Sequence, residues 1–301
     1  MNQQGLFVVA GGSSGIGLAV AETAAQRGYD LVLIGRGEPA LRGARDRVMG
    51  FGVECSTVAC DITDEERVNE LVQELSARSV PVVAWVHCAA VMTYGNVLDT
   101  PVEAFRRVLD VNVTGVFVAA KAIMPLFHDQ RSGHFVVMSS TLGHVVTPGI
   151  APYVTSKWAL RGLLGVLRVE QRRTSGIHIV EVSPWSTDTP IFDRAERYNY
   201  PAVCPPPPVD QATQVAKEVM DAVHSPSPWF RTRFVGRFSR LTSVVRNVSP
   251  APVDDLIALA WRIASRPSDS EGAPPSTHQS ARVSGGWAGR WLPRSLLRGA
   301  E

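Results

Sequence analysis

The chain has 301 residues, which is long enough for one α/β domain with an extension or for two smaller domains. Hydrophobic residues make up 45% of it and charged residues 19%, a globular composition that excludes wholesale disorder. Because 30 basic residues stand against 28 acidic ones, the net charge is only +2, and no general field exists to collect nucleic acid or acidic lipid.

Cysteine usage and the amino terminus bear on metal binding and location. The four cysteines form neither a C-x-x-C pair nor a cluster with histidine at metal-ligand spacing. The sequence therefore predicts no metal site and no disulfide framework, which fits a reducing compartment. The first apolar run, residues 6–10, has no basic segment before it, and no apolar stretch approaches the ~20 residues of a spanning helix. We expect a cytoplasmic protein without nucleic-acid partners.

Short β-branched segments alternate along the chain with longer amphipathic ones. The expected strands are residues 6–10, 30–34, 53–59, 81–86, 134–138 and 177–182. Their apolar residues are nearly continuous, which is typical of parallel strands covered by helices on both faces. The expected helices are residues 18–27, 64–77, 102–127 and 153–173, with apolar residues three and four apart. This alternation predicts an α/β fold with a doubly wound parallel sheet of the Rossmann type.

Two segments interrupt this alternation. Residues 184–208 contain many prolines with aromatic residues between them, so we expect an irregular loop. Residues 266–301 are rich in Pro, Ser, Gly and Arg, which predicts a flexible tail. We therefore expect one Rossmann-type domain over residues 1–265 and a carboxyl-terminal tail over residues 266–301.

A glycine-rich loop follows the first strand and opens directly into a helix. Its glycines permit a tight turn, close approach of the backbone to a pyrophosphate and close packing of helix on strand, while the helix N-terminus adds partial positive charge. Because strand, loop and helix occur in this order, we favour a dinucleotide site over a merely structural turn. The residues expected to bind the cofactor here are Gly11, Ser13, Ser14, Gly15, Ile16 and Gly17.

The spacing G-x-x-x-G-x-G resembles that of the short-chain dehydrogenase/reductase family. The resemblance implies that Asp61, directly after the third strand, contacts the adenine ring; a cap for the following helix is the alternative. Arg36 stands at the end of the second strand, where an NAD-specific site would hold an acidic residue. Since a guanidinium suits a 2′-phosphate, the sequence favours NADP(H) over NAD(H).

A tyrosine and a lysine four residues apart are expected to share one face of a helix. These are Tyr153 and Lys157, and a neighbouring ammonium favours a phenolate, so we expect the tyrosine pKa to fall from about 10 toward neutrality. The resemblance makes Tyr153 the general acid and base. It also implies that Ser140, thirteen residues before the tyrosine, hydrogen-bonds the same substrate oxygen. Asn112 matches the family asparagine that helps hold a water in the proton relay, beside a structural role in satisfying helix backbone.

Some positions depart from the family pattern. Residues 184–190 resemble its P-G-x-x-x-T segment, which implies that Thr189 holds the nicotinamide carboxamide. Trp185 replaces the usual glycine and adds bulk near the nicotinamide. His87 and Cys88 stand where two asparagines are common, and we expect both to pack at a strand end rather than to react.

Basic and aromatic residues alternate over residues 225–249, where no acidic residue occurs. One interpretation is a basic amphipathic helix for a membrane surface, striped by Phe230, Phe234 and Phe238. We favour the other, a seventh strand over residues 229–235 with a helix after it, because the sheet still needs its last strand. Membrane contact is therefore not expected.

The residues and the resemblance together predict an NADP(H)-dependent oxidoreductase that interconverts a secondary alcohol and a ketone or aldehyde. Aromatic side chains of the loop, Phe192, Tyr198 and Tyr200, indicate an apolar substrate unless they pack on the body of the protein. The resemblance implies a homo-oligomer through the helices at 102–127 and 153–173. The apolar face that permits this contains Trp158, Leu160, Leu164 and Leu167. The alternatives are a non-catalytic NADP(H)-binding regulatory or scaffold protein, and an enzyme that uses the cofactor for epimerisation or dehydration.

Overall fold

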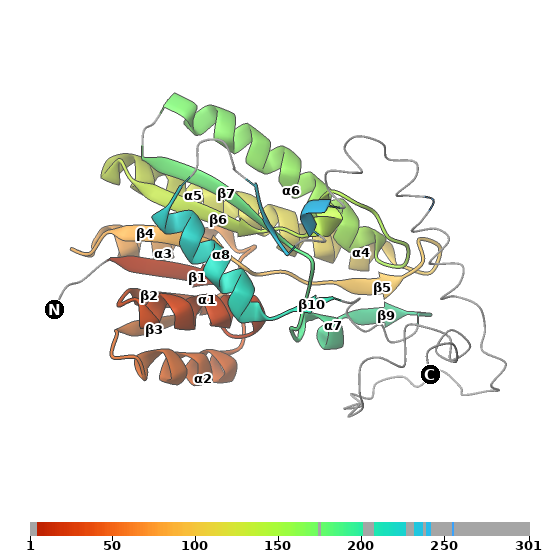
Figure 1. Ribbon diagram of the computed structural model, residues 1–301, viewed down its shortest axis with the longest axis horizontal. Coiled ribbons are helices and arrows are strands. Elements are labelled where there is room, and N and C mark those ends of the chain that lie inside the picture. Colours follow the sequence, from red (N-terminus) through yellow and green to blue (C-terminus); the bar gives the residue numbers. More distant parts are fainter. Residues whose placement is uncertain are drawn as a thin grey trace, which may run out of the picture.

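A parallel sheet forms the centre of the molecule (Figure 1). The computed structural model describes residues 5–173, 176–200, 208–226, 232–236, 239–241 and 255. Within them the sheet has the strand order β11-β7-β6-β4-β1-β2-β3, and every neighbouring pair is parallel. The strands are β1 (Leu6–Ala10), β2 (Asp30–Gly35), β3 (Cys55–Ala59), β4 (Val82–His87), β6 (Gly133–Met138), β7 (Ile177–Pro184) and β11 (Thr232–Val235).

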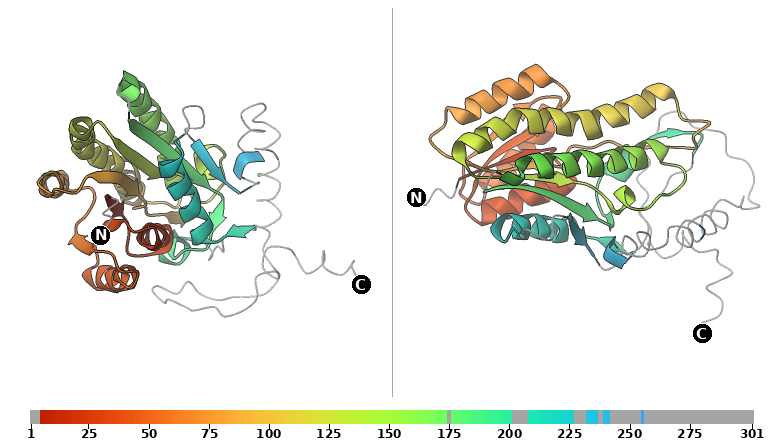
Figure 2. Two further views of the ribbon diagram at one scale, coloured as in Figure 1. Left: turned by 60° about the vertical axis from the view of Figure 1, so that its left-hand side comes forward. Right: turned by 90° about the horizontal axis from the view of Figure 1, so that it is seen from above.

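Helices cover both faces of this sheet (Figure 2). One face carries α1 (Gly15–Gln26), α2 (Glu38–Met49) and α8 (Ala212–His224). The other carries α3 (Glu65–Ser76), α5 (Gly115–Gln130) and α6 (Ala151–Glu170), with α4 (Val102–Leu109) packed on α6. Short helical turns are η1 (Asp110–Thr114), η2 (Thr141–Gly143), η3 (Gln171–Arg173) and α7 (Ile191–Arg194). Two small sheets pair β8 (Ser186–Thr187) with β10 (Val209–Asp210), and β5 (Thr93–Gly95) with β9 (Glu196–Tyr198).

The continuous apolar runs of the strands feed two separate cores. Along β1, Leu6 and Val8 belong to the core under α3, α5 and α6, whereas Phe7 and Val9 belong to the core under α1, α2 and α8. All residues of β1 are at most 3% exposed. Since burying one such side chain stabilises a fold by about 1.5–3 kcal/mol, neither face of a central strand tolerates a polar residue without a partner.

The predicted strands are confirmed to within two residues at each end. The seventh strand is also confirmed over its described part, β11, and it ends at Gly236 with φ +81°. Phe234 lies in that strand, so the amphipathic-helix interpretation is wrong there; Phe230 and Phe238 lie outside the described residues. Of the helix expected after it, only residues 239–241 are described, and they are helical.

Helices α2 and α8 are additions to the predicted elements. Helix α2 buries only Leu41, Ala44 and Val48, so its amphipathic signal is weak against a mainly polar composition. The predicted loop at 184–208 contains β8, α7 and β9 in its described part. Residues 266–301 lie outside the described residues, so the division into domain and tail stays a prediction.

The helix predicted over residues 102–127 is interrupted by the π-helical turn η1 and continues to Gln130. By length and composition this run, Val102–Gln130, is long and apolar enough to cross a membrane. No stretch of that kind was predicted from the sequence. The structure buries 61% of its most apolar window. That burial, against β4 and β6, is the environment of a core helix.

The apolar face predicted for oligomer contacts on α6 is wrong in part. Leu160 and Leu164 are 1% and 0% exposed and belong to the core under α6. The apolar side chains that α5 and α6 do expose are different ones: Phe117 is 53% exposed, Val166 56% and Val169 71%.

Candidate active site

The candidate site lies where the chain reverses its direction of travel across the sheet. From β1 the chain proceeds to β2 and β3 on one side, and from β4 to β6 and β7 on the other. The loops after β1 and β4 therefore diverge, and ligands of open α/β sheets bind in the crevice between them. The two strand ends meet directly, because the backbone N–H of Cys88 donates to the carbonyl oxygen of Ala10 at 2.8 Å.

Two glycines of the loop after β1, Gly11 and Gly17, stand where a side chain would not fit. Gly11 has φ +79°, and a Cβ there would lie 2.7 Å from the backbone nitrogen of Ala89. A Cβ on Gly17 would collide with the carbonyl oxygen of Gly11. Ser14 is the N-cap residue of α1 but makes no side-chain capping bond, and no acidic residue occupies the first turn. The helix N-terminus therefore keeps its partial positive charge and uncapped N–H groups, which fit a pyrophosphate.

The end of β2 lies beside this loop. The backbone N–H groups of Gly11 and Gly12 donate to the carbonyl oxygen of Ile34 at 2.8 and 3.3 Å. The Ser13 hydroxyl lies 3.4 Å from the position that a Cβ of Gly35 would take. Arg36 follows immediately and is exposed, so its guanidinium is free to meet a group bound along the edge of the loop.

Asp61 lies at the end of β3 and is held by three hydrogen bonds. It accepts from the backbone N–H and the hydroxyl of Thr63, at 3.1 and 2.8 Å, and from Arg107 Nη2 of α4 at 2.9 Å. Burial alone would raise the pKa of this carboxyl, but these hydrogen bonds outweigh it and lower the pKa. The N-cap of α3 is Asp64, so the alternative of a helix cap is wrong for Asp61. No motif in the sequence pointed to Arg107.

Tyr153, Lys157 and Ser140 come together as predicted. The ammonium of Lys157 lies 5.3 Å from the centroid of the Tyr153 ring, and it donates to the carbonyl oxygen of Met138 at 2.9 Å. Lys157 is 2% exposed, and burial lowers its pKa to about 8. The Ser140 hydroxyl accepts from the backbone N–H of Leu142 at 3.1 Å and also hydrogen-bonds the Tyr153 side chain.

The expected fall in the tyrosine pKa is not found. Burial raises the pKa of Tyr153 to about 12, and the hydrogen bond with Ser140 offsets only part of this effect. A buried phenolate loses its hydration, which disfavours the charged form. In this state of the protein Tyr153 is therefore a phenol that keeps its proton at neutral pH.

Asn112 lies in the π-helical turn η1, a local irregularity of the kind that often occurs at functional sites. Its carbonyl oxygen accepts from the backbone N–H of Val91 at 2.8 Å. Its amide donates to the carbonyl oxygen of Val91 at 2.9 Å and to the Ser156 hydroxyl at 3.0 Å. The side chain thus ties the loop after β4 to α6, and its backbone partner lies in that loop rather than in a helix, so the predicted role in satisfying helix backbone is not found. The role in a water relay stays a prediction.

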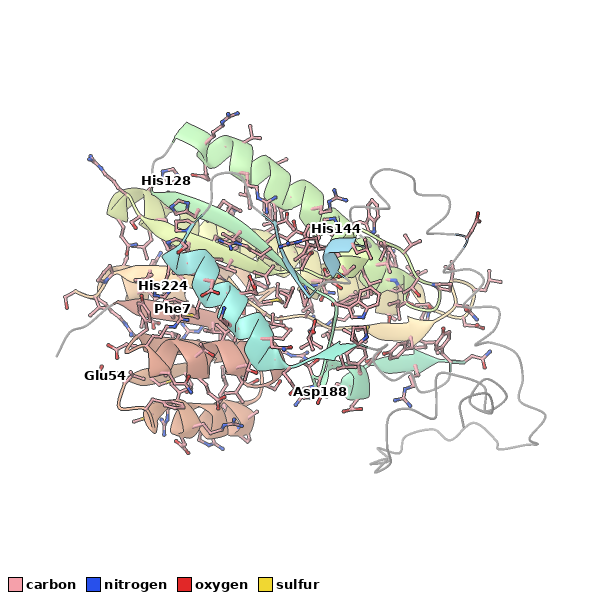
Figure 3. The ribbon with its side chains drawn as sticks, in the orientation of Figure 1. Phe7, Glu54, His128, His144, Asp188 and His224 are labelled. Atoms are coloured by element: carbon pink, nitrogen blue, oxygen red, sulfur yellow. The ribbon has the colours of Figure 1, made fainter. Side chains whose placement is uncertain are left out.

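A buried group of polar side chains lies behind the serine loop and was not predicted. Glu181 on β7 is 1% exposed and accepts from the Thr232 hydroxyl of β11 at 3.0 Å. Its carboxylate lies 3.6 Å from His144 Nε2 and 3.7 Å from an Arg168 Nη2 nitrogen of α6. Burial on its own would raise the pKa of Glu181, but His144, a hydrogen bond with Ser139 and the charge of Arg168 lower that pKa to about 2. His144, labelled in Figure 3, packs its ring against that of Phe234 on β11 with centroids 4.9 Å apart.

His87 and Cys88 pack at the end of β4, as expected. His87 is 1% exposed, neither ring nitrogen has a hydrogen-bond partner among the described residues, and burial lowers its pKa to about 3. Burial raises the pKa of the Cys88 thiol to about 12, which makes it a poor nucleophile. Among the described residues, no group of three or more His, Cys, Asp or Glu side chains is arranged to hold a metal ion.

The segment after β7 crosses over the glycine loop. Trp185 is half-buried between β7 and β8, and the Thr189 hydroxyl donates to the carbonyl oxygen of Thr187 at 3.3 Å. The Thr189 side chain lies 3.3 Å from the place of a Cβ on Gly15, so this segment touches the phosphate loop. Asp188, labelled in Figure 3, marks where the crossing begins, and α7 follows it (Figure 1).

An apolar cluster adjoins Tyr153 on the other side. Its buried members are Met92, Tyr94, Ile150, Val154 and Ala195, and the side chains packed against it include Tyr153, Ile191, Phe192 and Tyr200. The rings of Tyr94 and Tyr200 stack with centroids 6.0 Å apart. Phe192 and Tyr200 therefore line one apolar region with Tyr153, whereas the Tyr198 hydroxyl donates to Glu196 at 2.6 Å near the surface.

Two curated relatives cover most of this region. An uncharacterized oxidoreductase of Staphylococcus saprophyticus is 34% identical over 192 residues, which is 63% of this chain and 81% of the relative. A 3-dehydrosphinganine reductase of Danio rerio is 30% identical over 225 residues, 72% of this chain and 68% of the relative.

Solved structures show the same fold. An actinorhodin polyketide ketoreductase with NADPH superposes with a TM-score of 0.66 at 24% identity, over 77% of this chain and 95% of that one. An NAD+-bound xylitol dehydrogenase gives 0.59 at 29% identity, over 62% and 71%. Residues 6–199 match the family model described as short chain dehydrogenase, which is more than half of the chain. The chain therefore belongs to the short-chain dehydrogenase family, and it is an oxidoreductase with the fold that binds a nicotinamide dinucleotide.

Proposed function

We propose that this protein is an NADP(H)-dependent oxidoreductase that interconverts a secondary alcohol and a ketone or aldehyde, with Tyr153 as the proton donor and acceptor. The observation that carries the proposal is the meeting of Ser140, Tyr153 and Lys157 between the glycine loop and an apolar cluster. Tyr153 and Lys157 lie on α6 and Ser140 lies in the turn after β6, so a surface helix pair alone does not account for the arrangement.

The geometry of the site suggests a separate role for each catalytic residue. The cofactor, when bound, supplies or accepts the hydride at the carbon of the substrate. Tyr153 holds the proton that passes to the carbonyl oxygen in reduction, and the Ser140 hydroxyl is placed to bond the same oxygen. The charge of Lys157 stabilises the phenolate that remains. Since burial raises the Tyr153 pKa to about 12, the phenol carries at neutral pH the proton that a carbonyl oxygen takes up in reduction.

The preference for NADP(H) rests on the end of β2. Arg36 is exposed beside the glycine loop. A planar guanidinium can form two charge-assisted hydrogen bonds with the oxygens of a 2′-phosphate, whereas the 2′-hydroxyl of NAD(H) carries no charge for it to pair with. The similar structures include one with NADPH and one with NAD+, so they favour neither cofactor. Replacing Arg36 with Gln is expected to weaken NADPH binding and to leave NADH binding nearly unchanged.

The substrate is proposed to be a mainly apolar carbonyl compound. Tyr153 is packed against apolar and aromatic side chains from β5, α6 and α7, which would leave a polar substrate without partners. Two of the similar proteins are named as reductases, of 3-dehydrosphinganine and of a polyketide. We also propose a homo-oligomer through the exposed apolar residues Phe117, Val166 and Val169 of α5 and α6.

The test is consumption of NADPH and NADH with a panel of aliphatic, aromatic, steroid-like and acyl-thioester ketones. Tyr153→Phe is expected to lose roughly a hundredfold to ten-thousandfold of kcat/KM while still binding NADPH. Tyr198→Phe is the matched control, because its hydroxyl donates to the exposed Glu196 near the surface and its loss is expected to leave turnover intact. Unchanged activity of Tyr153→Phe would refute the role of the tyrosine. Tight NADPH binding without turnover on any ketone would support the non-catalytic alternative instead.

A further inference from the structure

A cation from the segment that crosses the phosphate loop is placed at the uncapped end of α1. Arg194, the last residue of α7, donates from Nη1 to the Ser14 hydroxyl at 3.1 Å, although the two residues are 180 positions apart in the chain. Its own backbone is fixed by a hydrogen bond to the carbonyl oxygen of Pro190 at 3.1 Å. The nearby packing of Thr189 on Gly15 makes this the second contact between the crossing segment and the loop.

The charges at this place are unbalanced within the described residues. Arg194 makes no ion pair with any carboxylate that the structure describes, including its neighbours Asp188 and Asp193. Its hydrogen-bond partner is a neutral hydroxyl. The first turn of α1 has no acidic residue and no side-chain cap, so the positive end of the helix dipole faces the same place. Two positive groups that converge without an anion leave a site suited to a doubly charged ligand group.

We propose that Arg194 is a cofactor-binding residue that contacts the pyrophosphate beside Ser14 of the glycine loop. The inference rests on the proposed function, because it needs a nicotinamide dinucleotide in the loop. A guanidinium forms short, charge-assisted hydrogen bonds with phosphate oxygens, which are stronger than its bond to the Ser14 hydroxyl. Arg194 therefore exchanges a neutral partner for a charged one when the dinucleotide binds.

This assignment also gives α7 a role toward the substrate. Ile191 and Phe192 of the same short helix pack against the apolar cluster that contains Tyr153. One end of α7 thus touches the phosphate loop and the other touches the expected substrate region. A pyrophosphate that binds Arg194 would therefore also fix the position of Ile191 and Phe192 beside the apolar cluster.

The pyrophosphate is common to NADPH and NADH, so a contact with it affects the binding of both. The role of Arg194 can therefore be tested separately from the preference for one cofactor. Calorimetric titrations of the full-length protein with NADPH and with NADH measure binding without turnover. Arg194→Gln is expected to raise the dissociation constant for both ligands by the same factor, roughly tenfold to a hundredfold, the range for a hydrogen bond between charged groups. Arg194→Lys keeps the charge but not the planar fork, so a smaller loss is expected. Arg197→Gln, an exposed arginine of β9 three residues away, is the matched control and is expected to bind like the wild type.

Three results would overturn the inference. Wild-type affinity of Arg194→Gln for both ligands would remove Arg194 from the site. A loss for Arg197→Gln as large as that for Arg194→Gln would mean that any positive charge nearby acts in the same way, without a contact specific to Arg194. A loss for NADPH alone would assign Arg194 to the 2′-phosphate. In all three cases the wild type still binds a dinucleotide and the proposed function survives, whereas failure of the wild type to bind either ligand would overturn both.

Discussion

Replacing Glu181 with Gln tests how much the buried polar group behind the serine loop contributes to stability. Gln has nearly the same shape and still accepts the hydrogen bond from Thr232, but it removes the negative charge. Arg168, whose side chain is 14% exposed, then keeps its charge without the nearby carboxylate. Breaking a buried pair by removing one partner costs about 3–5 kcal/mol, because the remaining charge is left uncompensated.

The pKa of Glu181 leads to a similar magnitude. A carboxyl whose pKa falls from 4.5 to about 2 on folding stabilises the folded state by about 3 kcal/mol, at about 1.4 kcal/mol per pH unit. Because the folded pKa is the lower one, this contribution is complete above about pH 4.5 and is lost as the pH falls toward 2. We therefore expect Glu181→Gln to lower the free energy of unfolding by about 3 kcal/mol at pH 7, with the difference from wild type closing in acid.

The assay is equilibrium urea denaturation followed by tryptophan fluorescence, for which Trp85, fully buried in the sheet, is a sensitive reporter. Glu66→Gln is the control, since Glu66 is exposed on α3 and makes no ion pair within the described part of the chain. Adding Arg168→Met to Glu181→Gln removes the charge that has lost this carboxylate and is expected to recover part of the loss. A loss under 1 kcal/mol at pH 7, or a loss that does not change with pH, would refute the electrostatic reasoning.

Three further predictions concern the site. The buried Lys157, with its pKa near 8, should remain charged below that pH, so kcat/KM for ketone reduction is expected to fall above about pH 8; a pH profile that stays flat to pH 9.5 would contradict this. Gly17→Ala should abolish dinucleotide binding in titrations, because its methyl collides with the Gly11 carbonyl oxygen, whereas Gly162→Ala, with open space around it on α6, should bind normally and gain about 0.5–1 kcal/mol in stability. Asn112→Leu leaves the backbone N–H and carbonyl of Val91 without partners, and urea denaturation should show a loss of about 1–3 kcal/mol for each group left unbonded in the interior.

Much of the fold could be predicted because its signals are local. The apolar runs of the central strands, the glycine loop and the Tyr153–Lys157 spacing each lie within a few consecutive residues, where backbone periodicity and steric limits act directly. The order of the strands across the sheet is not among these local signals, because it depends on pairing between strands that are far apart in the chain. Helix α2 was not predicted because few of its residues are apolar, and its burial depends on the neighbouring elements rather than on its own pattern.

The contacts that decide the chemistry of the site join residues far apart in the chain. Asp61 meets Arg107 across 46 positions, and Ser14 meets Arg194 across 180. Periodicity on α6 identified an apolar stripe, but only the packed sheet determined that Leu160 and Leu164 face inward while Val166 and Val169 face outward. The pKa of Tyr153 is the clearest case: the Lys157 spacing favoured a lower value, whereas burial in the folded protein raises it to about 12. Sequence spacing determines which groups can meet, and the tertiary structure decides how much water each of them loses, which sets their charge and reactivity.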